Sequence, residues 1–285
     1  MNKKFLYLFA SCLLILSCKA QIKNESFETD NDGVTVEKLD STNKDENRYN
    51  HNNLIYKVGR RFTFTYFYED KNGDKYLINR SNANSQNDYD WRFENIEKKD
   101  TNSIDEIILK VKSGLSPFIQ NIPDYNQTVI LYEYQTLNGK VEINEMTGII
   151  ENSKNIWVHP PRTDLFKILE LNPFPYIKAP FEVGNKWNWK LNFGDHWSDK
   201  RWLAWKGENE NIYSYQIIKK AKISTKIGDL DCYIVESSAK SKLGTTKLTS
   251  YFNENFGFVK LYYTNIDSTK IVIELKSVEN TITQY

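Results

Sequence analysis

Large apolar side chains alternate with smaller or polar ones in two stretches of the chain. From Phe62 to Tyr68 every second residue is aromatic, and from Trp187 to Phe193 every second residue is a large apolar side chain. A period of two places such side chains on one face of a β-strand. Both stretches are therefore predicted as strands that bury one aromatic face, with the tryptophans of the second stretch in the core.

Two Asn-Gly pairs follow strand-like stretches in the first half. Asn72-Gly73 follows the first alternating stretch, and Asn138-Gly139 separates residues 129–136 from 140–146. Both residues of such a pair tolerate positive φ, which favours a hairpin turn. Further strand candidates lie at 104–111, 128–134, 214–223, 231–236, 245–252, 257–264 and 270–278. Their spacing of roughly ten residues is typical of an antiparallel meander that closes into a barrel or sandwich.

Prolines gather in the middle of the chain. Five of the seven lie in residues 155–180, where they force extended backbone. Residues 165–169 give the apolar stripe of one short helix, which Thr163 or Asp164 can cap. The helix must end before Pro173. We interpret this segment as a rigid connector that docks two β-rich halves against each other.

The second alternating stretch repeats the first at an offset of 125 residues, since Val58-Gly59 corresponds to Val183-Gly184. A tandem duplication would give this match, and so would similar hairpins in any β protein. The predicted fold is mostly β, with two antiparallel lobes, each a half-barrel or a sandwich. The lobes are expected at residues 54–154 and 181–285, joined by the Pro-rich connector at 155–180.

Composition supports this fold class and narrows the partners. Aromatic residues make up 14% of the 285 residues, which favours strands over helices. Lysine and arginine number 38 against 37 acidic residues, for a net charge of +1. A chain this close to neutrality gives no reason to expect a nucleic acid partner.

The chain opens with two lysines and an apolar run at residues 5–16 that is too short to span a bilayer. The run ends in Ile15-Leu16-Ser17-Cys18, which resembles the lipobox of bacterial lipoproteins. The resemblance implies a signal peptide at residues 1–17, cleavage before Cys18, and acylation of the cysteine with chains such as palmitate. An ordinary signal peptide is the alternative. Acylation with two or three chains would hold the mature protein at a membrane.

Residues 18–53 are polar, rich in asparagine and almost free of aromatics. Such a segment is predicted to form a flexible tether, with a span on the order of 30 Å. No acidic run follows Cys18, in contrast to surface-exported lipoproteins of some Gram-negative groups. We therefore expect a lipid anchor in the bacterial outer membrane, on the periplasmic face. Cys232 is left without a disulfide partner and is interpreted as a buried structural thiol.

The C-terminal half resembles a class of uncharacterised envelope β-domains. The resemblance lies in Gly184-x-x-Trp187-x-Trp189, the strand at 227–234 and the hairpin at 251–260. It implies an open, lipoprotein-carrier-like half-barrel and carries over no catalytic residue. The asparagine- and lysine-rich tether and the lipobox are similar to those of Bacteroidota proteins, in which Asp-Ser-Thr is an O-glycosylation acceptor. That resemblance implies candidate O-glycosylation sites at Ser41 and Ser268.

Five tryptophans crowd into residues 187–205. Trp197 lies in a polar turn beside Asp195 and His196, where an indole is hard to bury and can stack on a sugar ring or a lipid. Packing of Trp197 on the neighbouring lobe is the alternative. The candidate ligand-binding residues are therefore Asp195, His196, Trp197 and Trp202.

The motifs of several enzyme classes are missing. The sequence has no His-x-His, His-Glu-x-x-His or Cys-x-x-Cys pair, no Gly-x-Ser-x-Gly, no phosphate loop and no dinucleotide fingerprint. No metal, cofactor or catalytic residue is assigned. We expect a non-catalytic, membrane-anchored envelope lipoprotein that binds an apolar ligand, a glycan or a protein partner. The alternatives are an envelope hydrolase acting on glycans and a purely structural envelope component.

Overall fold

The computed structural model describes residues 27–38, 52–80, 91–113 and 127–280. The first half contains β1 (Phe27–Thr29), β2 (Thr35–Glu37), β3 (Arg60–Glu69), β4 (Lys75–Asn79), β5 (Arg92–Asn95), β6 (Ser103–Val111), β7 (Thr128–Thr136), β8 (Val141–Glu151), β9 (Asn155–Val158) and β10 (Tyr176–Lys178). The second contains β11 (Lys186–Phe193), β12 (Asn209–Thr225), β13 (Gly228–Ser241), β14 (Gly244–Asn253), β15 (Gly257–Thr264) and β16 (Lys270–Asn280). Three 3-10 helices are η1 (Ile96–Lys98), η2 (Asp164–Leu171) and η3 (Asp195–Trp197).

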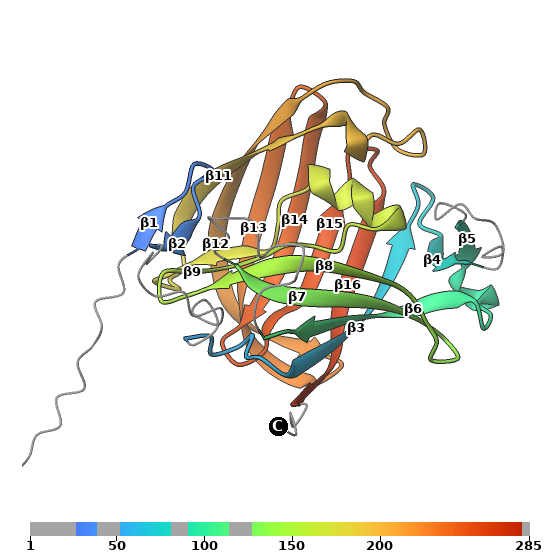
Figure 1. Cartoon of the computed structure of the whole chain (residues 1–285), viewed down its shortest axis with the longest axis horizontal. Coiled ribbons are helices and arrows are strands. Elements are labelled where there is room, and N and C mark those ends of the chain that lie inside the picture. The colour runs from blue at the N-terminus through green and yellow to red at the C-terminus, as the bar shows by residue number, and fades with distance from the viewer. Residues whose placement is uncertain (1–26, 39–51, 81–90, 114–126, 281–285) are drawn as a thin grey trace, which may run out of the picture.

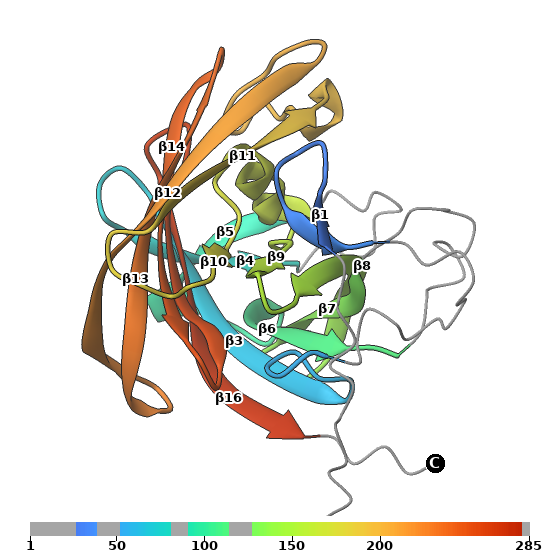
Figure 2. The ribbon, with the colours of Figure 1, turned by 90° about the vertical axis from the view of Figure 1, so that its left-hand side faces the viewer.

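Fourteen strands form one antiparallel sheet, in the order β10-β9-β8-β7-β6-β4-β3-β16-β15-β14-β13-β12-β11, with β5 beside β4. The strands of each half are contiguous in this order, and the halves meet where β3 pairs with β16. The sheet curves around an interior that holds β9 and β10 (Figure 2). The predicted mostly β, antiparallel fold is confirmed. The two Asn-Gly hairpins are also confirmed, joining β3 to β4 and β7 to β8.

The alternating stretches turn their aromatic faces into the core. Trp187 and Trp189 of β11 are 7% and 4% exposed. Their rings stack on Tyr215 and Tyr213 of β12, with centroids 5.4 and 4.5 Å apart. Cys232 on β13 is buried as well. The predictions of two buried tryptophans and a buried thiol are therefore confirmed.

The predicted short helix is η2, a 3-10 helix that ends before Pro173 as expected. The apolar side chains of residues 165–169 are at most 1% exposed. Thr163 stands at the N-cap position, as predicted, but without the expected side-chain bond. Asp164 Oδ2 instead accepts from Arg80 Nη1 at 2.9 Å. A buried guanidinium is a stronger partner for this carboxylate than a helix N-terminus.

Residues 27–38 form the small hairpin β1–β2, which docks beside β11 (Figure 1). Val34 and Val36 are each 2% exposed. The backbone of Thr35 donates to Asn155 Oδ1 at 2.9 Å and accepts from Asn155 Nδ2 at 3.0 Å. This hairpin corrects the expectation of a continuous flexible tether, because two alternating valines give a polar segment one face that can be buried.

Candidate functional site

A cavity of about 430 Å³ lies where hairpin β1–β2 meets β9, β11, the η2 region and η3. Pockets of this size hold small ligands in many proteins. Its lining includes Asp30, Asp32, Val34, Trp157, His159, Arg162, Glu170, Phe174, Trp189, Leu191, Gly194, His196, Trp197 and Glu208. Segments far apart in the sequence therefore build one site.

Three aromatic rings form one wall of the cavity. The centroids of Trp157 and Phe174 are 5.6 Å apart, and that of Trp189 is 6.0 Å from Trp157 and 5.4 Å from Phe174. Trp189 Nε1 donates to the Tyr215 hydroxyl at 2.7 Å, which fixes the plane of its ring. Trp157, Phe174 and Trp189 are only 6%, 1% and 4% exposed, so they make this wall apolar. The half-buried Trp197 offers the ring on which the C–H face of a sugar can stack.

Glu170 and His159 form a buried polar pair in the cavity. Together with Arg162 they are here termed the floor of the cavity. His159 Nε2 is 3.4 Å from Glu170 Oε1. Burial lowers the pKa of His159 to about 3 and raises that of Glu170 to about 8. Both groups are therefore uncharged at neutral pH, and the carboxyl carries the proton. His159 Nδ1 lies 2.8 Å from Pro160 O, which assigns the Nδ1–H tautomer and leaves Nε2 as an acceptor.

Arg162 lies beside this pair. Its Nη1 is 3.5 Å from His159 Nε2, and its Nη2 donates to Met146 O at 3.4 Å. The guanidinium carbon is 5.9 Å from the centroid of the Trp197 ring. Among the residues that the structure describes, no carboxylate oxygen lies within 4 Å of this guanidinium. Arg162 therefore places in the cavity a cation that makes no direct ion pair with a described carboxylate.

The rim of the cavity is polar. A Cβ at Gly194 would stand 2.8 Å from Glu208 Oε1 and 2.9 Å from His196 Nδ1, so a larger residue there would displace these side chains. On the hairpin, Asp30 Oδ1 accepts backbone N–H groups of residues 32, 33 and 34 at 2.8 to 3.1 Å. Burial, and then the charge of Asp30, raise the pKa of Asp32. The cavity thus combines an aromatic wall with polar groups at floor and rim.

Of the four candidate ligand-binding residues, the structure brings His196 and Trp197 to the cavity. Asp195 Oδ2 accepts instead from the backbone N–H of Gly207 at 2.8 Å. Trp202 packs against the core, with its ring centroid 5.5 Å from the Arg201 guanidinium. Neither Asp195 nor Trp202 lines the cavity. Ligand binding by these residues stays a prediction.

The predicted modification and anchoring sites fall in different places. Cys18, the signal peptide at 1–17 and Ser41 lie outside the described residues. Ser268 is exposed in the turn between β15 and β16, where its backbone N–H donates to Asn265 O. No helix in the described part of the chain is long and apolar enough to cross a membrane. O-glycosylation of Ser268 stays a prediction.

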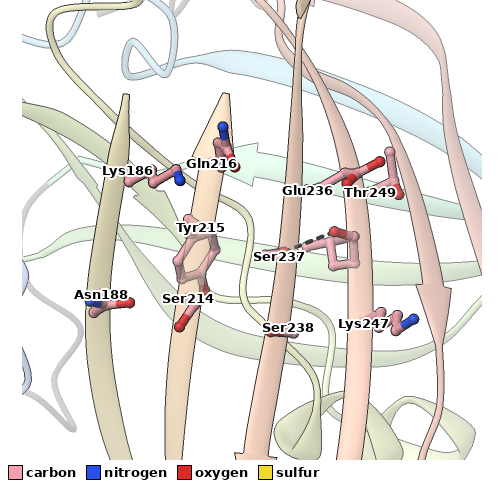
Figure 3. A pocket seen from close by; sticks show the side chains of 11 residues that line it. Lys186, Asn188, Ser214, Tyr215, Gln216, Glu236, Ser237, Ser238, Lys247 and Thr249 are labelled. Atoms are coloured by element: carbon pink, nitrogen blue, oxygen red, sulfur yellow. Dashed lines mark hydrogen bonds between the residues drawn. The ribbon is translucent and has the colours of Figure 1, made fainter. Parts of the chain in front are cut away.

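A second hollow, of about 600 Å³, lies on the outward face of β11–β14. Figure 3 shows its side chains in two rows across the strands: Lys186, Gln216, Glu236 and Thr249 in one, and Asn188, Ser214, Ser238 and Lys247 in the other. These side chains are exposed or half-buried, and the one aromatic residue of the lining, Tyr215, is buried with its ring stacked on Trp187. The described residues also contain no group of three or more His, Cys, Asp and Glu side chains that could hold a metal ion. The cavity behind the hairpin is therefore the stronger candidate.

Sequence reasoning did not single out Asp30, Asp32 or Glu170 as site residues. Asp30-Asn31-Asp32-Gly33 is a turn-forming run followed by alternating valines, which could have indicated a hairpin. Glu170 is an acid in an otherwise apolar helical stripe, which could have indicated a buried carboxyl. These three residues come together at the cavity only because strands pair across the whole sheet.

No protein-family model and no curated protein matches the chain. Three solved structures are similar to it. A candidate lipoprotein from Parabacteroides distasonis is 12% identical, with a TM-score of 0.42 over 79% of this chain and 97% of that chain. A candidate exported protein with a YmcC-like fold from Bacteroides fragilis is 10% identical, with a TM-score of 0.42 over 79% of this chain and 98% of that chain. The hypothetical lipoprotein YmcC from Escherichia coli is 6% identical, with a TM-score of 0.33 over 76% and 83%. Similarities this low do not assign the chain to a family.

Proposed function

We propose that this chain is a non-catalytic lipoprotein of the bacterial envelope that binds a glycan in the cavity behind hairpin β1–β2. The observation that carries the proposal is the meeting of the Trp157–Phe174–Trp189 wall with polar groups in about 430 Å³. Aromatic rings stack on sugar C–H groups, while carboxylates, histidine and arginine bond hydroxyls. A purely apolar ligand would leave the polar floor and rim unpaired, which costs free energy.

The anchor in this proposal is Cys18, acylated after removal of residues 1–17. The lipobox-like Ile15-Leu16-Ser17-Cys18 supports it, and the missing acidic run supports the periplasmic face of the outer membrane. The test is the mass of the chain purified from envelopes. The wild type should carry acyl chains on an N-terminal cysteine and fractionate with the membrane. Cys18→Ser should lose both, and a wild type without acyl mass would contradict the anchor.

Glycan binding is tested by titrating the full chain, purified in detergent, with an array of envelope oligosaccharides. We expect Trp197→Ala to weaken binding at least about tenfold, since a stacked aromatic residue contributes on the order of 1–3 kcal/mol. Trp202→Ala is the matched control, because its indole packs outside the cavity. Equal affinities of the two variants would remove Trp197 from the site.

A second candidate function is glycan hydrolysis in the same cavity. The protonated Glu170 favours it, because a carboxyl with a raised pKa can act as a general acid. Incubation of the chain with labelled oligosaccharides would then release reducing ends, and Glu170→Gln would abolish the release. Binding without turnover in the wild type leaves the non-catalytic function in place.

A protein partner or a purely structural role would give a different result in native mass spectrometry. A bound glycan adds mass that is lost on denaturation. The calculated mass of the lipidated chain in both states, together with a cross-linked protein neighbour, would exclude the glycan and favour an envelope assembly. Mass retained on denaturation would indicate covalent modification, with Ser268 as the first residue to map.

A further inference from the structure

The floor of the cavity carries a positive charge that the fold does not neutralise. The Arg162 guanidinium makes only long contacts, 3.5 Å to His159 Nε2 and 3.4 Å to Met146 O. Over the described ranges, no carboxylate oxygen reaches it within 4 Å. A guanidinium offers five N–H donors in a planar fork. Donors therefore remain for an acceptor that enters the cavity.

The acids beside Arg162 are buried, and burial disfavours their charged forms. It raises the pKa of Glu170 to about 8, which keeps this carboxyl neutral at pH 7. Burial also raises the pKa of Glu145, whose carboxylate accepts the Arg162 backbone N–H at 2.9 Å and the Tyr134 hydroxyl at 2.7 Å. His159 is neutral as well. Arg162 is thus the cation of the floor, and the Glu145 carboxylate beside it is bonded to a backbone N–H and to Tyr134 instead of the guanidinium.

Glu170 lies buried beside Arg162, with His159 as its nearest polar neighbour. Its side chain is 4% exposed, and Oε1 makes no hydrogen bond within the part of the chain that the structure describes. A buried polar atom left unpaired costs on the order of 1–3 kcal/mol. The protonated carboxyl faces the acceptor Nε2 of His159 at 3.4 Å, which leaves Arg162 as the group of the floor that meets a ligand.

The carboxylates at the rim are otherwise engaged or face water. Asp30 accepts three backbone N–H groups of its own turn. The charge of Lys190 acts on Asp32 and lowers its pKa against the effect of burial. Glu208 is exposed, where solvent screens its charge. None of these three acids forms an ion pair with Arg162 in the described part of the chain, so the guanidinium donors stay open to an anion.

We propose that the cavity takes an acidic sugar, whose carboxylate pairs with the fork of Arg162 while its ring stacks on Trp197. This inference rests on the proposed glycan-binding function and names the substrate class. A carboxylate matches the planar fork with two parallel hydrogen bonds, which gives orientation as well as affinity. Trp197, 5.9 Å from the guanidinium carbon, limits the positions that the fork can take.

The test compares matched probes on the full detergent-purified chain by calorimetry. The probes are trimers of galacturonic acid and of glucuronic acid, their methyl esters, and glucosamine trimers. We expect at least one acid trimer to bind about tenfold or more tighter than its ester, the ratio expected for one charge-assisted hydrogen bond. The ester keeps the shape of the acid and removes its charge.

Variants test whether Arg162 causes the preference for the acid over the ester. Arg162→Gln should abolish the difference between acid and ester, and Arg162→Lys should keep part of it, because an ammonium is a point charge without a fork. Arg92→Gln is the matched control: this arginine is 55% exposed and pairs with Glu94 at 3.4 Å, outside the cavity. The control should bind as the wild type does. A preference that survives Arg162→Gln would overturn the assignment.

Two further outcomes would overturn the inference while leaving the proposed function intact. Esters that bind as tightly as acids would mean that Arg162 does not recognise charge. Glucosamine trimers that bind tightest would mean that the rim carboxylates decide the selection. Absence of binding by sugars of every charge, here and on the oligosaccharide array, would instead refute the glycan function itself.

Discussion

At the scale of single residues, Glu151 fixes the segment that leads into β3. Its buried carboxylate accepts the backbone N–H groups of Leu54, Ile55 and Tyr56 at 2.7 to 2.8 Å. Three N–H groups on one carboxylate fix the chain direction ahead of β3. Sequence alone does not indicate this contact, because Glu151 lies 95 to 97 residues from its partners.

Glu151→Ala should lower the free energy of unfolding by about 3 kcal/mol, because three N–H groups lose a charged acceptor in a buried place. Urea denaturation measures the change. Glu182→Ala removes an exposed carboxylate and should stay within about 0.5 kcal/mol of the wild type. Similar values for the two variants would show that the contact contributes little to stability.

At the scale of elements, the alternation of apolar residues predicted β3 and β11, and Asn-Gly pairs predicted two hairpins, because these signals are local. Hairpin β1–β2 was not predicted. Its strands have three residues each, too few for a clear period of two, and its stability comes from Asn155 and Trp189 on other strands. Two cavity residues on it, Asp30 and Asp32, were missed for the same reason.

Gly33→Ala should loosen this hairpin. A Cβ there would stand 3.3 Å from Trp189 Cα, at a φ of +102°. The strain should be on the order of 1–3 kcal/mol. Hydrogen exchange should therefore speed up about tenfold or more at the Lys190 N–H, which donates to Asp32 O at 2.7 Å. The other amide to follow is Thr35.

Gly73→Ala provides the control. Its φ of +90° imposes similar backbone strain, but no atom lies within 4 Å of the added Cβ. Exchange at Lys190 and Thr35 should not change in this variant. If it rose equally, the effect would come from global destabilisation rather than from the close approach of hairpin and β11.

At the scale of the whole molecule, one curved sheet places side chains from both halves around a single interior. Local signals predicted the fold class and the antiparallel meander. The union of the halves at β3 and β16 could not be predicted, because it pairs Phe62 with Val278 across the whole chain. The cavity follows from that closure, so its floor could not be predicted either.

Two buried groups on that floor should set the pH range of stability. Glu170 has a pKa of about 8 in the folded protein and 4.5 in the unfolded chain. Its contribution to the free energy of unfolding is therefore complete below pH 4.5 and is lost as pH rises to 8. His159 has a pKa of about 3 in the folded protein and 6.5 in the unfolded chain. Its contribution to the free energy of unfolding is therefore lost as pH falls from 6.5 to 3. The two slopes offset each other between pH 4.5 and 6.5. Arg162 and Glu145 face Glu170, and they respectively lower and raise its pKa.

Urea midpoints from pH 5 to 9 test this expectation. The wild type should lose stability between pH 6.5 and 8, at up to about 1.4 kcal/mol per pH unit. Glu170→Gln should flatten that decline, and Glu182→Gln should not. His159→Asn should remove the offset below pH 6.5, so that the stability of this variant falls with rising pH from pH 5 onward. The same alkaline slope in the wild type and in Glu170→Gln would contradict the neutral state of the floor.

The docked hairpin also sets how far the molecule can stand from a bilayer. With Cys18 acylated as proposed, only residues 19–26 connect the lipid to β1 at Phe27. Nine peptide steps reach about 30 Å at full stretch and about 17 Å on average for a flexible chain. The cavity that this hairpin helps to line would thus stay within that distance of the membrane. It could exchange cargo at the surface of its own membrane, and a component anchored across the periplasm would have to bring its cargo there.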